Sequence, residues 1–236
     1  MARKPRIFVA DLPYHVVQRG NNKNPIFFSE KDYLFFLTAL REAKIKYPCL
    51  IYSYCLMPNH FHLLIQPKEK DNISLLLKLL GSKYVRYVNK VYGRSGTLWE
   101  GRFKCSVIDA EEYFLTCLRY IEMNPLRAGL VNKIENYPWS SYKCRAFGEN
   151  DYLTDFDVWY SELSSRSFQR QLIYRCQFQG GLNNSGFDLI REMTGRGAVI
   201  GGETFKVKIE QLINQKIIIR KPGRPYKKLN NSDPVF

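Results

Sequence analysis

The apolar and polar positions in the first half of the chain follow two periods, one typical of strands and one typical of helices. Residues 14–19 alternate and predict a strand within the segment 7–19, and the Asn- and Gly-containing run at 20–25 predicts a turn. Ser29, with acidic residues directly after it, is typical of a helix start. Leucines at near-helical spacing extend this helix to about Lys46.

The following residues add further strands and two more helices. The pattern predicts strands at 50–57 and 59–66 interrupted at Pro58, a helix at about 73–92, one or two strands within 98–108, and a helix from 109 or 110 to Pro125. This order, close to β-α-β-β-α-β-α, predicts an α+β fold. We expect a ferredoxin-like or RRM-like antiparallel sheet with helices on one face.

Composition divides the chain into three parts. Residues 1–148 suffice for one such domain. Residues 149–205 begin with an acidic, aromatic stretch and are predicted to be an accessory, partly helical region. Residues 206–236 hold eight Lys or Arg against two acidic residues and predict a basic tail. The domain is therefore followed by a partly helical, basic C-terminal extension.

The charge points to a polyanionic partner. The 236 residues include 36 Lys and Arg against 22 Asp and Glu, a net charge of +14 and a pI of about 9.5. Sixteen tyrosines and fifteen phenylalanines are mixed among the basic residues, and aromatic faces stack on unpaired bases while Arg and Lys follow phosphates. We therefore expect nucleic acid, with single-stranded regions favoured. A merely soluble basic protein is the alternative that composition leaves open.

The sequence favours a cytoplasmic, nucleoid-associated protein. It contains no apolar run long enough to span a bilayer, and its basic N-terminus leads into polar sequence without an apolar signal core. Six cysteines are scattered without a CxxC pair, which suits reduced thiols. We expect no membrane partner and no small-molecule cofactor.

Two of the three histidines stand one residue apart in the predicted strand at 59–66. Successive strand side chains point to opposite faces, so His60 and His62 share one face, about 6.6 Å apart at Cα. Such a pair can bind one divalent cation. Two imidazoles satisfied by hydrogen bonds are the alternative, but packing them without a shared partner is costly, so we favour a metal. His15 is one candidate for a further ligand, and a structural role is equally open to it.

The helix that ends before Pro125 carries a tyrosine and an amide one turn apart. Tyr120 and Asn124 are four residues apart and share a helix face. A phenol can attack phosphorus when a metal neutralises the phosphate and the helix holds the oxygen in line. The Asn124 amide could complete the metal shell begun by the histidines. Taken alone, a core tyrosine and a helix-ending asparagine are the commoner roles.

Five motifs occur in an order that resembles a known family. They are YHVVQRGN at 14–21, YCLMPNHFHLLI at 54–65, LWEGRFK at 98–104, RYIEMNPLRAGLV at 119–131 and YPWSSY at 137–142. Over residues 1–145 the chain resembles the REP-associated tyrosine transposases, insertion-sequence-like members of the single-tyrosine HUH superfamily. His60-Phe61-His62 matches the HUH pattern of histidine, hydrophobic residue, histidine.

The resemblance implies a reaction and a set of site residues. Residues 1–148 would form the catalytic domain, with Mg²⁺ or Mn²⁺ on His60, His62 and Asn124 and with Tyr120 as the nucleophile. It implies cleavage of single-stranded, hairpin-forming DNA through a 5′-phosphotyrosine link, followed by rejoining without ATP, and hence DNA transposition. Monomer and homodimer both remain open.

Basic and aromatic residues supply the candidate DNA contacts. They are Arg19, Arg86, Arg94, Trp99, Arg102, Lys104 and Arg127 in the domain, and Arg220, Lys221 and Arg224 in the tail. The alternatives are a solvated basic face for the cations and a core-capping role for Trp99. Residues 220–228 are similar to an AT-hook, which enters an A·T-rich minor groove, although a disordered basic tail would also fit this composition.

Two other functions compete with the transposase. A histidine-triad nucleotide hydrolase needs a third alternating histidine, and Leu64 occupies that position. A non-catalytic nucleic-acid-binding module would not need His60, His62 and Tyr120 together. Both observations favour the enzyme.

Overall fold

The computed structural model describes residues 8–178 and 184–217 and contains a four-stranded antiparallel sheet. Its strands are β1 (Tyr14–Arg19), β2 (Cys49–Met57), β3 (His60–Pro67) and β4 (Lys104–Val107). They lie in the order β2-β3-β1-β4, with one long helix between β1 and β2 and another between β3 and β4. This is the ferredoxin-like arrangement, so the predicted α+β fold class is confirmed.

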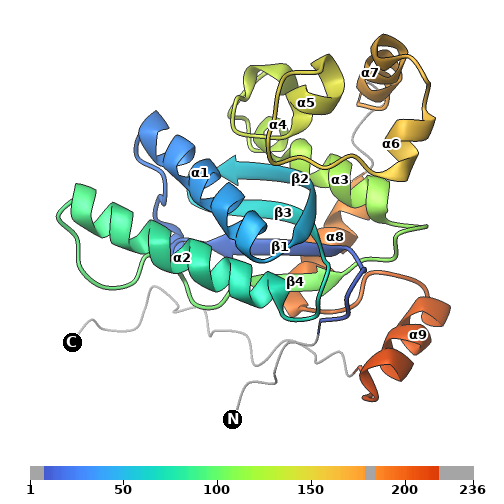
Figure 1. Ribbon diagram of the computed structural model, residues 1–236, viewed down its shortest axis with the longest axis horizontal. Helices are drawn as coiled ribbons and strands as arrows, with labels where there is room; N and C mark the ends of the chain where they lie inside the picture. Colours follow the sequence, from blue (N-terminus) through green and yellow to red (C-terminus); the bar gives the residue numbers. More distant parts are fainter. Residues whose placement is uncertain (1–7, 179–183, 218–236) are drawn as a thin grey trace, which may run out of the picture.

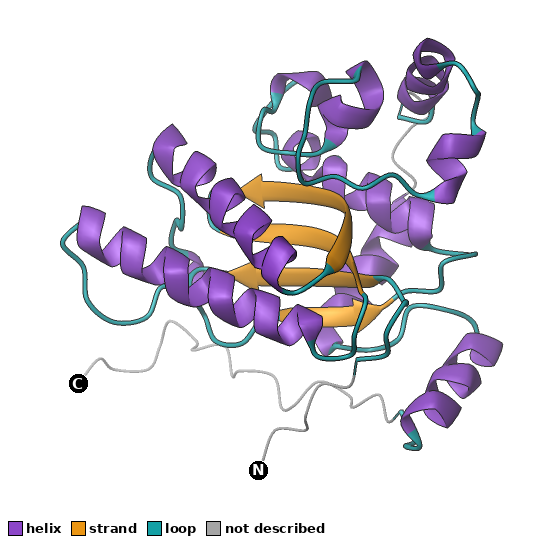
Figure 2. Ribbon diagram, viewed as in Figure 1, coloured by secondary structure: helices purple, strands orange, loops and turns teal. Residues whose placement is uncertain are grey.

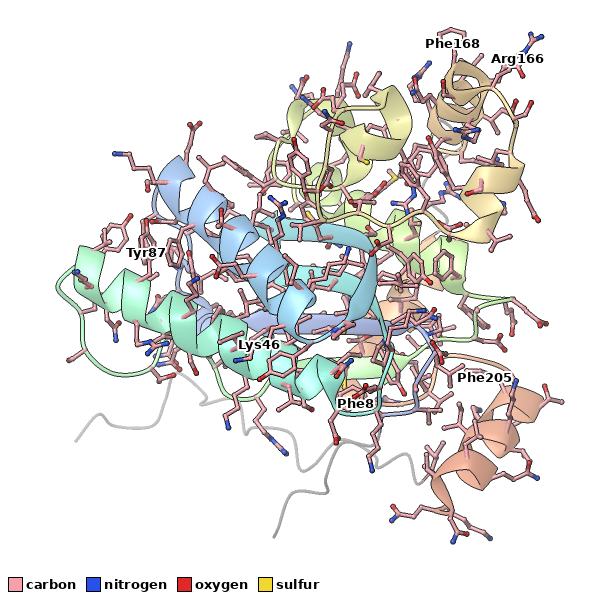
Figure 3. The ribbon with its side chains drawn as sticks, viewed as in Figure 1. Phe8, Lys46, Tyr87, Arg166, Phe168 and Phe205 are labelled. Carbon is pink, nitrogen blue, oxygen red and sulfur yellow. The ribbon has the colours of Figure 1, made fainter. Side chains whose placement is uncertain are left out.

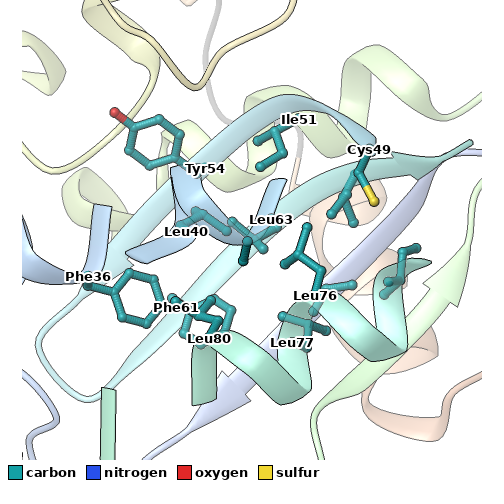
Figure 4. Close-up of a cluster of buried hydrophobic side chains, with 14 of the residues drawn as sticks. Phe36, Leu40, Cys49, Ile51, Tyr54, Phe61, Leu63, Leu76, Leu77 and Leu80 are labelled. Carbon is teal, nitrogen blue, oxygen red and sulfur yellow. The ribbon is translucent and has the colours of Figure 1, made fainter. Parts of the chain in front are cut away.

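The two long helices, α1 (Glu30–Lys46) and α2 (Asn72–Val91), cover one face of the sheet (Figure 1). Helix α1 begins as predicted, because the Ser29 side chain and the Asp32 carboxylate form a reciprocal capping box. Apolar side chains of both helices and of β2 and β3 interlock beneath them; Phe36, Leu40, Phe61, Leu63 and Leu76 are buried there (Figure 4). This layer is the main core and fixes the strands that carry the histidines.

Other helices lie on the opposite face, so the sheet has helices on both sides (Figure 2). Helix α3 (Phe114–Glu122) packs on β2 and β3 and leads into α4 (Asn124–Arg127), while α8 (Asn184–Arg196) packs on β1 and β4. A second apolar cluster joins them, with Leu118 and Ile121 from α3 and Ile190 from α8. A helix from the region predicted to be accessory therefore covers the sheet itself.

The remaining elements are short and lie around this framework. They are α5 (Tyr142–Phe147), α6 (Val158–Glu162), α7 (Ser167–Cys176), α9 (Glu203–Ile213) and the 3₁₀ turns Asn21–Lys23 and Ile134–Asn136. Phe168 of α7 projects outward, whereas Phe205 of α9 belongs to the main core (Figure 3). Residues 149–205 are thus partly helical, as expected. The division at 148 and 205 stays a prediction. Across the described ranges, no helix combines the length and apolar character needed to cross a bilayer.

Three boundaries differ from the sequence prediction. The helix predicted to run to Pro125 is divided: α3 ends at Glu122, and Asn124 is the first residue of α4. Helix α3 begins at Phe114 rather than at 109 or 110, because Asp109 accepts the backbone N–H groups of Glu111 (3.2 Å, on its carboxylate) and Tyr113 (2.9 Å, on its carbonyl) and forms a turn. Residues 98–103 add only a bridge between Gly20 and Trp99 to the sheet. Gly101, with φ of 125°, interrupts the predicted strand in a conformation that favours glycine.

Candidate active site

Strand β3 directs His60 and His62 to the sheet face that α3 and α8 cover. Phe61, between them, points to the main core on the other face. Antiparallel pairing sets His60 opposite Arg19 and His62 opposite Val17 of β1. The two imidazole centroids are 4.9 Å apart. The alternation of a strand therefore brings the rings together as predicted.

Both imidazoles are neutral and present nitrogen lone pairs suited to a cation. Burial lowers the pKa of His60 to about 4, with nearby Arg19 lowering it further, and its Nδ1 lies 2.6 Å from the Asn59 carbonyl Oδ1. Because the amide oxygen only accepts, Nδ1 carries the proton and Nε2 is left as the ligand atom. Burial, together with His60 and His15, places the pKa of His62 well below its usual range. The Nε2 atom of His62 is buried without a hydrogen-bond partner among the described residues.

His15 of β1, whose role the sequence left open, stands behind His62. Its Nε2 lies 2.9 Å from the Nδ1 of His62, and its Nδ1 lies 2.7 Å from the Oγ1 of Thr194 on α8. The two rings are stacked, with centroids 5.1 Å apart and planes 9° apart. Burial lowers the pKa of His15 to about 3. Both of its nitrogens are engaged in these contacts, so His15 has a structural role beside the pair.

Helix α3 places Tyr120 edge-on to the histidines. Its ring centroid is 5.7 Å from that of His62 and 5.6 Å from that of His15. The Arg127 guanidinium lies over the tyrosine ring, 5.2 Å from its centroid. Burial raises the pKa of Tyr120, while the positive charges of Arg127 and Arg191 act in the opposite direction. The phenol thus lies in a site whose cations favour its ionised form.

Asn124 is both a helix cap and part of the same site. Its side-chain nitrogen Nδ2 donates to the carbonyls of Tyr120 (2.7 Å) and Ile121 (3.3 Å) at the end of α3. Both bonds use the amide nitrogen and leave the carbonyl oxygen Oδ1 as a ligand atom. The two roles considered from the sequence, helix terminator and ligand, are therefore compatible.

These side chains line one cavity of about 610 Å³. Its walls include His15, Arg19, His60 and His62 from β1 and β3, Glu100, Arg102 and Lys104 before and in β4, Tyr120, Asn124 and Arg127 from α3 and α4, and Arg191 and Thr194 from α8. Among the lining side chains, five are basic and one, Glu100, is acidic. The cavity therefore carries positive charge beside the Tyr120 phenol, and this suits an anionic substrate.

The predicted DNA-contact residues fall into three groups. Arg19, Arg102, Lys104 and Arg127 line the cavity. Arg86 is exposed on α2, Arg94 follows that helix, and Trp99 packs against the main core near Phe61 and Tyr84. The structure therefore favours the core-capping role for Trp99. The third group, Arg220, Lys221 and Arg224, lies outside the described residues.

Sequence reasoning missed the contribution of α8. Arg191 and Thr194 line the cavity, and Phe187 packs edge-on against Tyr120 with centroids 5.7 Å apart. An arginine, a threonine and a phenylalanine at helical spacing are common on any amphipathic helix. The sequence therefore offered no signal that would separate this helix from an ordinary one.

Comparison with known proteins finds a family that matches the first half of the chain and a curated relative. The family model described as "Transposase IS200 like" matches residues 8–124, which include every residue of the histidine, tyrosine and asparagine set. A curated protein of Haemophilus influenzae, named as a REP-associated tyrosine transposase, is 27% identical over 117 residues. That alignment covers 45% of this chain and 66% of the relative, just under two thirds of its length.

A solved structure supports the fold. It is described as a REP-associated tyrosine transposase bound to a REP hairpin, and it superposes with a TM-score of 0.54 at 19% identity. The match covers 67% of this chain and 93% of the other. The family match and the curated relative, with the five motifs, show that this chain belongs to the IS200-like transposase family, and the solved structure shows the same fold.

Proposed function

We propose that this protein is a metal-dependent endonuclease and strand transferase for hairpin-forming single-stranded DNA, which it cleaves through a 5′-phosphotyrosine link to Tyr120 during DNA transposition. The observation that carries the proposal is the convergence of two neutral histidines, an amide oxygen and a buried tyrosine on one basic cavity. The hairpin substrate is suggested by the DNA named for the solved relative.

The ligand atoms in this cavity fit a divalent cation. The described residues contain no group of three or more His, Cys, Asp or Glu side chains that could hold a metal, so the set we propose is mixed: His60, His62 and the amide oxygen of Asn124. The unpartnered Nε2 of His62 is the strongest sign of fit, because a buried polar atom without a partner is costly. Bound Mg²⁺ or Mn²⁺ would polarise the scissile phosphate and neutralise its charge.

The protein's own residues would supply the nucleophile and the positioning. The Tyr120 phenol must lose its proton to attack, and the adjacent Arg127 and Arg191 stabilise the phenolate by charge. Attack of this oxygen on phosphorus breaks the bond to the 3′ oxygen of the upstream strand, which departs as a 3′-hydroxyl. Attack by a 3′-hydroxyl on the phosphotyrosine reverses the step. Arg102, Lys104 and Arg19 would hold the flanking phosphates.

A covalent-adduct assay tests this proposal. Hairpin DNA labelled at its 3′ end is incubated with the protein and Mn²⁺, and the products are separated on a denaturing gel. We expect a labelled protein–DNA adduct with the wild type. Tyr113→Phe, which changes a tyrosine in the turn that precedes α3, is the control and should form the same adduct. Tyr120→Phe should reduce the adduct below detection while it binds the hairpin with wild-type affinity.

The histidine role is tested in the same assay. His60→Ala should abolish the adduct and leave hairpin binding largely intact, because the basic walls of the cavity remain. An equal loss of binding and cleavage would contradict the assigned ligand role. Binding without an adduct in every variant, the wild type included, would favour a non-catalytic nucleic-acid-binding module.

A further inference from the structure

A chain of buried hydrogen bonds links α8 to the proposed metal site. Thr194 Oγ1 lies 2.7 Å from Nδ1 of His15, and Nε2 of His15 lies 2.9 Å from Nδ1 of His62. All three side chains are nearly inaccessible, at 2%, 0% and 4% exposure. Thr194 and His15, which are 179 positions apart in the sequence, are thus in direct hydrogen-bond contact.

The proton count in this chain allows two arrangements. A neutral imidazole carries one N–H, so one ring nitrogen donates and the other accepts. In the first arrangement Thr194 donates to His15, His15 donates to His62, and the Nε2 of His62 carries a proton toward the cavity. In the second, His62 donates from Nδ1 to His15, His15 donates from Nδ1 to Thr194, and the Nε2 of His62 presents a lone pair.

The two arrangements differ in what they offer a cation. A protonated Nε2 cannot ligate, and in this site it would be a buried donor without an acceptor. A deprotonated Nε2 is a ligand, as metal-bound histidines normally are when the other ring nitrogen donates to a fixed acceptor. Only the second arrangement makes His62 a ligand, and it requires Thr194 to accept.

We infer that Thr194 and His15 are positioning residues, which hold His62 in the tautomer whose Nε2 lone pair faces the cavity. This inference rests on the proposed metal site and extends it beyond the family-matched residues 8–124 to helix α8. Thr194 lines the cavity, and in this role it acts on the cation only through His15. Its hydroxyl oxygen accepts a hydrogen bond from the Nδ1–H of His15, which leaves the Nε2 of His15 to accept from the Nδ1–H of His62.

The matched variants separate this role from simple packing. Thr194→Val keeps the shape of the side chain but removes the acceptor, whereas Thr194→Ser keeps the hydroxyl. Ser106→Ala is the control for docking of α8, since Ser106 Oγ of β4 donates to the Met193 carbonyl (3.1 Å) rather than to a ring nitrogen of His15, its cross-strand neighbour. Far-UV circular dichroism and thermal unfolding establish that each variant folds.

The direct readout is the tautomer of each ring, from ¹⁵N shifts of the histidine side chains in the metal-free protein. The chain has three histidines, so a His60→Ala spectrum leaves two rings to assign. We expect Nδ1-protonated rings for both His15 and His62 in the wild type, in Thr194→Ser and in Ser106→Ala. Thr194→Val should shift both rings toward Nε2 protonation.

The second readout is Mn²⁺ affinity by calorimetry, without DNA. We expect Thr194→Val to bind Mn²⁺ about 10- to 100-fold more weakly, and Thr194→Ser and Ser106→Ala to stay within about threefold of the wild type. An Nε2-protonated His62 in the wild type, or wild-type affinity in Thr194→Val, would overturn the positioning role. Failure of the wild type to bind Mn²⁺ at all would instead contradict the metal site of the proposed function.

Discussion

His15, His60 and His62 are the chain's only histidines, and all three lie in one cluster in which His15 and His62 are buried and His60 is half-buried. Burial lowers the pKa of His15 to about 3 and that of His60 to about 4, so these rings are neutral at physiological pH. Neutral imidazoles serve as ligands or as hydrogen-bond links rather than as cationic phosphate contacts. The positive charge of the cavity therefore comes from arginine and lysine.

At the residue scale, Asp32 should make stability depend on pH. Its carboxylate is buried, which raises its pKa, but the backbone N–H groups of Phe28 and Ser29 and the hydroxyls of Tyr92 and Tyr87 donate to it and lower the pKa more. The folded-state pKa thus lies below the unfolded value of about 3.9. This stabilisation is present above the unfolded pKa and is lost as the pH falls through the folded pKa.

We therefore expect Asp32→Asn to reduce the free energy of unfolding by about 1–3 kcal/mol at pH 7. Urea unfolding measures this difference between pH 7 and pH 3, and the gap from the wild type should narrow below about pH 4. Glu30→Gln, an exposed change in the same helical turn, should have an effect below about 0.5 kcal/mol. A gap that stays constant down to pH 3 would argue against the charged role of Asp32.

At the scale of elements, a buried carboxylate fixes the helix that carries the nucleophile. Glu122 of α3 is fully buried and accepts hydrogen bonds from Ser141 Oγ (2.6 Å) and from the Tyr174 hydroxyl of α7 (2.6 Å). Burial raises the pKa of Glu122, while Arg145 and these hydroxyls act in the opposite direction. Glu122 lies two residues after Tyr120, so these hydrogen bonds hold the end of α3 that carries the tyrosine against Ser141 and α7.

Removing one donor should therefore weaken the fold more than a surface change does. Tyr174→Phe leaves the ring but takes a hydrogen bond from a buried carboxylate, and we expect a loss of about 1–3 kcal/mol in the free energy of unfolding. Tyr152→Phe, at a tyrosine that is 74% exposed, should change it by less than about 0.5 kcal/mol. Chemical denaturation measures the free energy of unfolding of both variants. Equal values would contradict the anchoring role of the Glu122 cluster.

At the scale of the whole molecule, the local patterns of the sequence were sufficient for the sheet and its core. The alternation around His60 and His62 depends only on neighbouring residues, and the structure has it. Tyr120 and Asn124 are joined by a hydrogen bond one turn apart, although they lie on α3 and α4 rather than on one helix. The role of α8 depends on contacts across most of the chain, such as Thr194 with His15. A contact of this kind leaves no periodic pattern of apolar and polar residues in the sequence. The turn at 109–113 was missed because it depends on a local hydrogen bond from the Glu111 N–H to the Asp109 carboxylate, which the apolar pattern does not reveal.

The distribution of charge predicts where salt acts on DNA binding. Arg102 lines the cavity, whereas Arg86 is exposed on α2, on the other face of the sheet. Arg102→Ala should weaken hairpin binding and reduce the slope of log affinity against log salt by about 0.7. Arg86→Ala should leave the slope unchanged. Fluorescence anisotropy at several salt concentrations tests this, and equal reductions would mean that DNA also contacts α2.

The chemistry is tested most directly by identifying the residue bound to DNA. The adduct formed on the hairpin is digested with nuclease and trypsin, and the modified peptide is sequenced by mass spectrometry. We expect a nucleotide joined through its 5′ phosphate to Tyr120, one of sixteen tyrosines in the chain. Attachment to any other residue, or through a 3′ phosphate, would contradict the proposed mechanism.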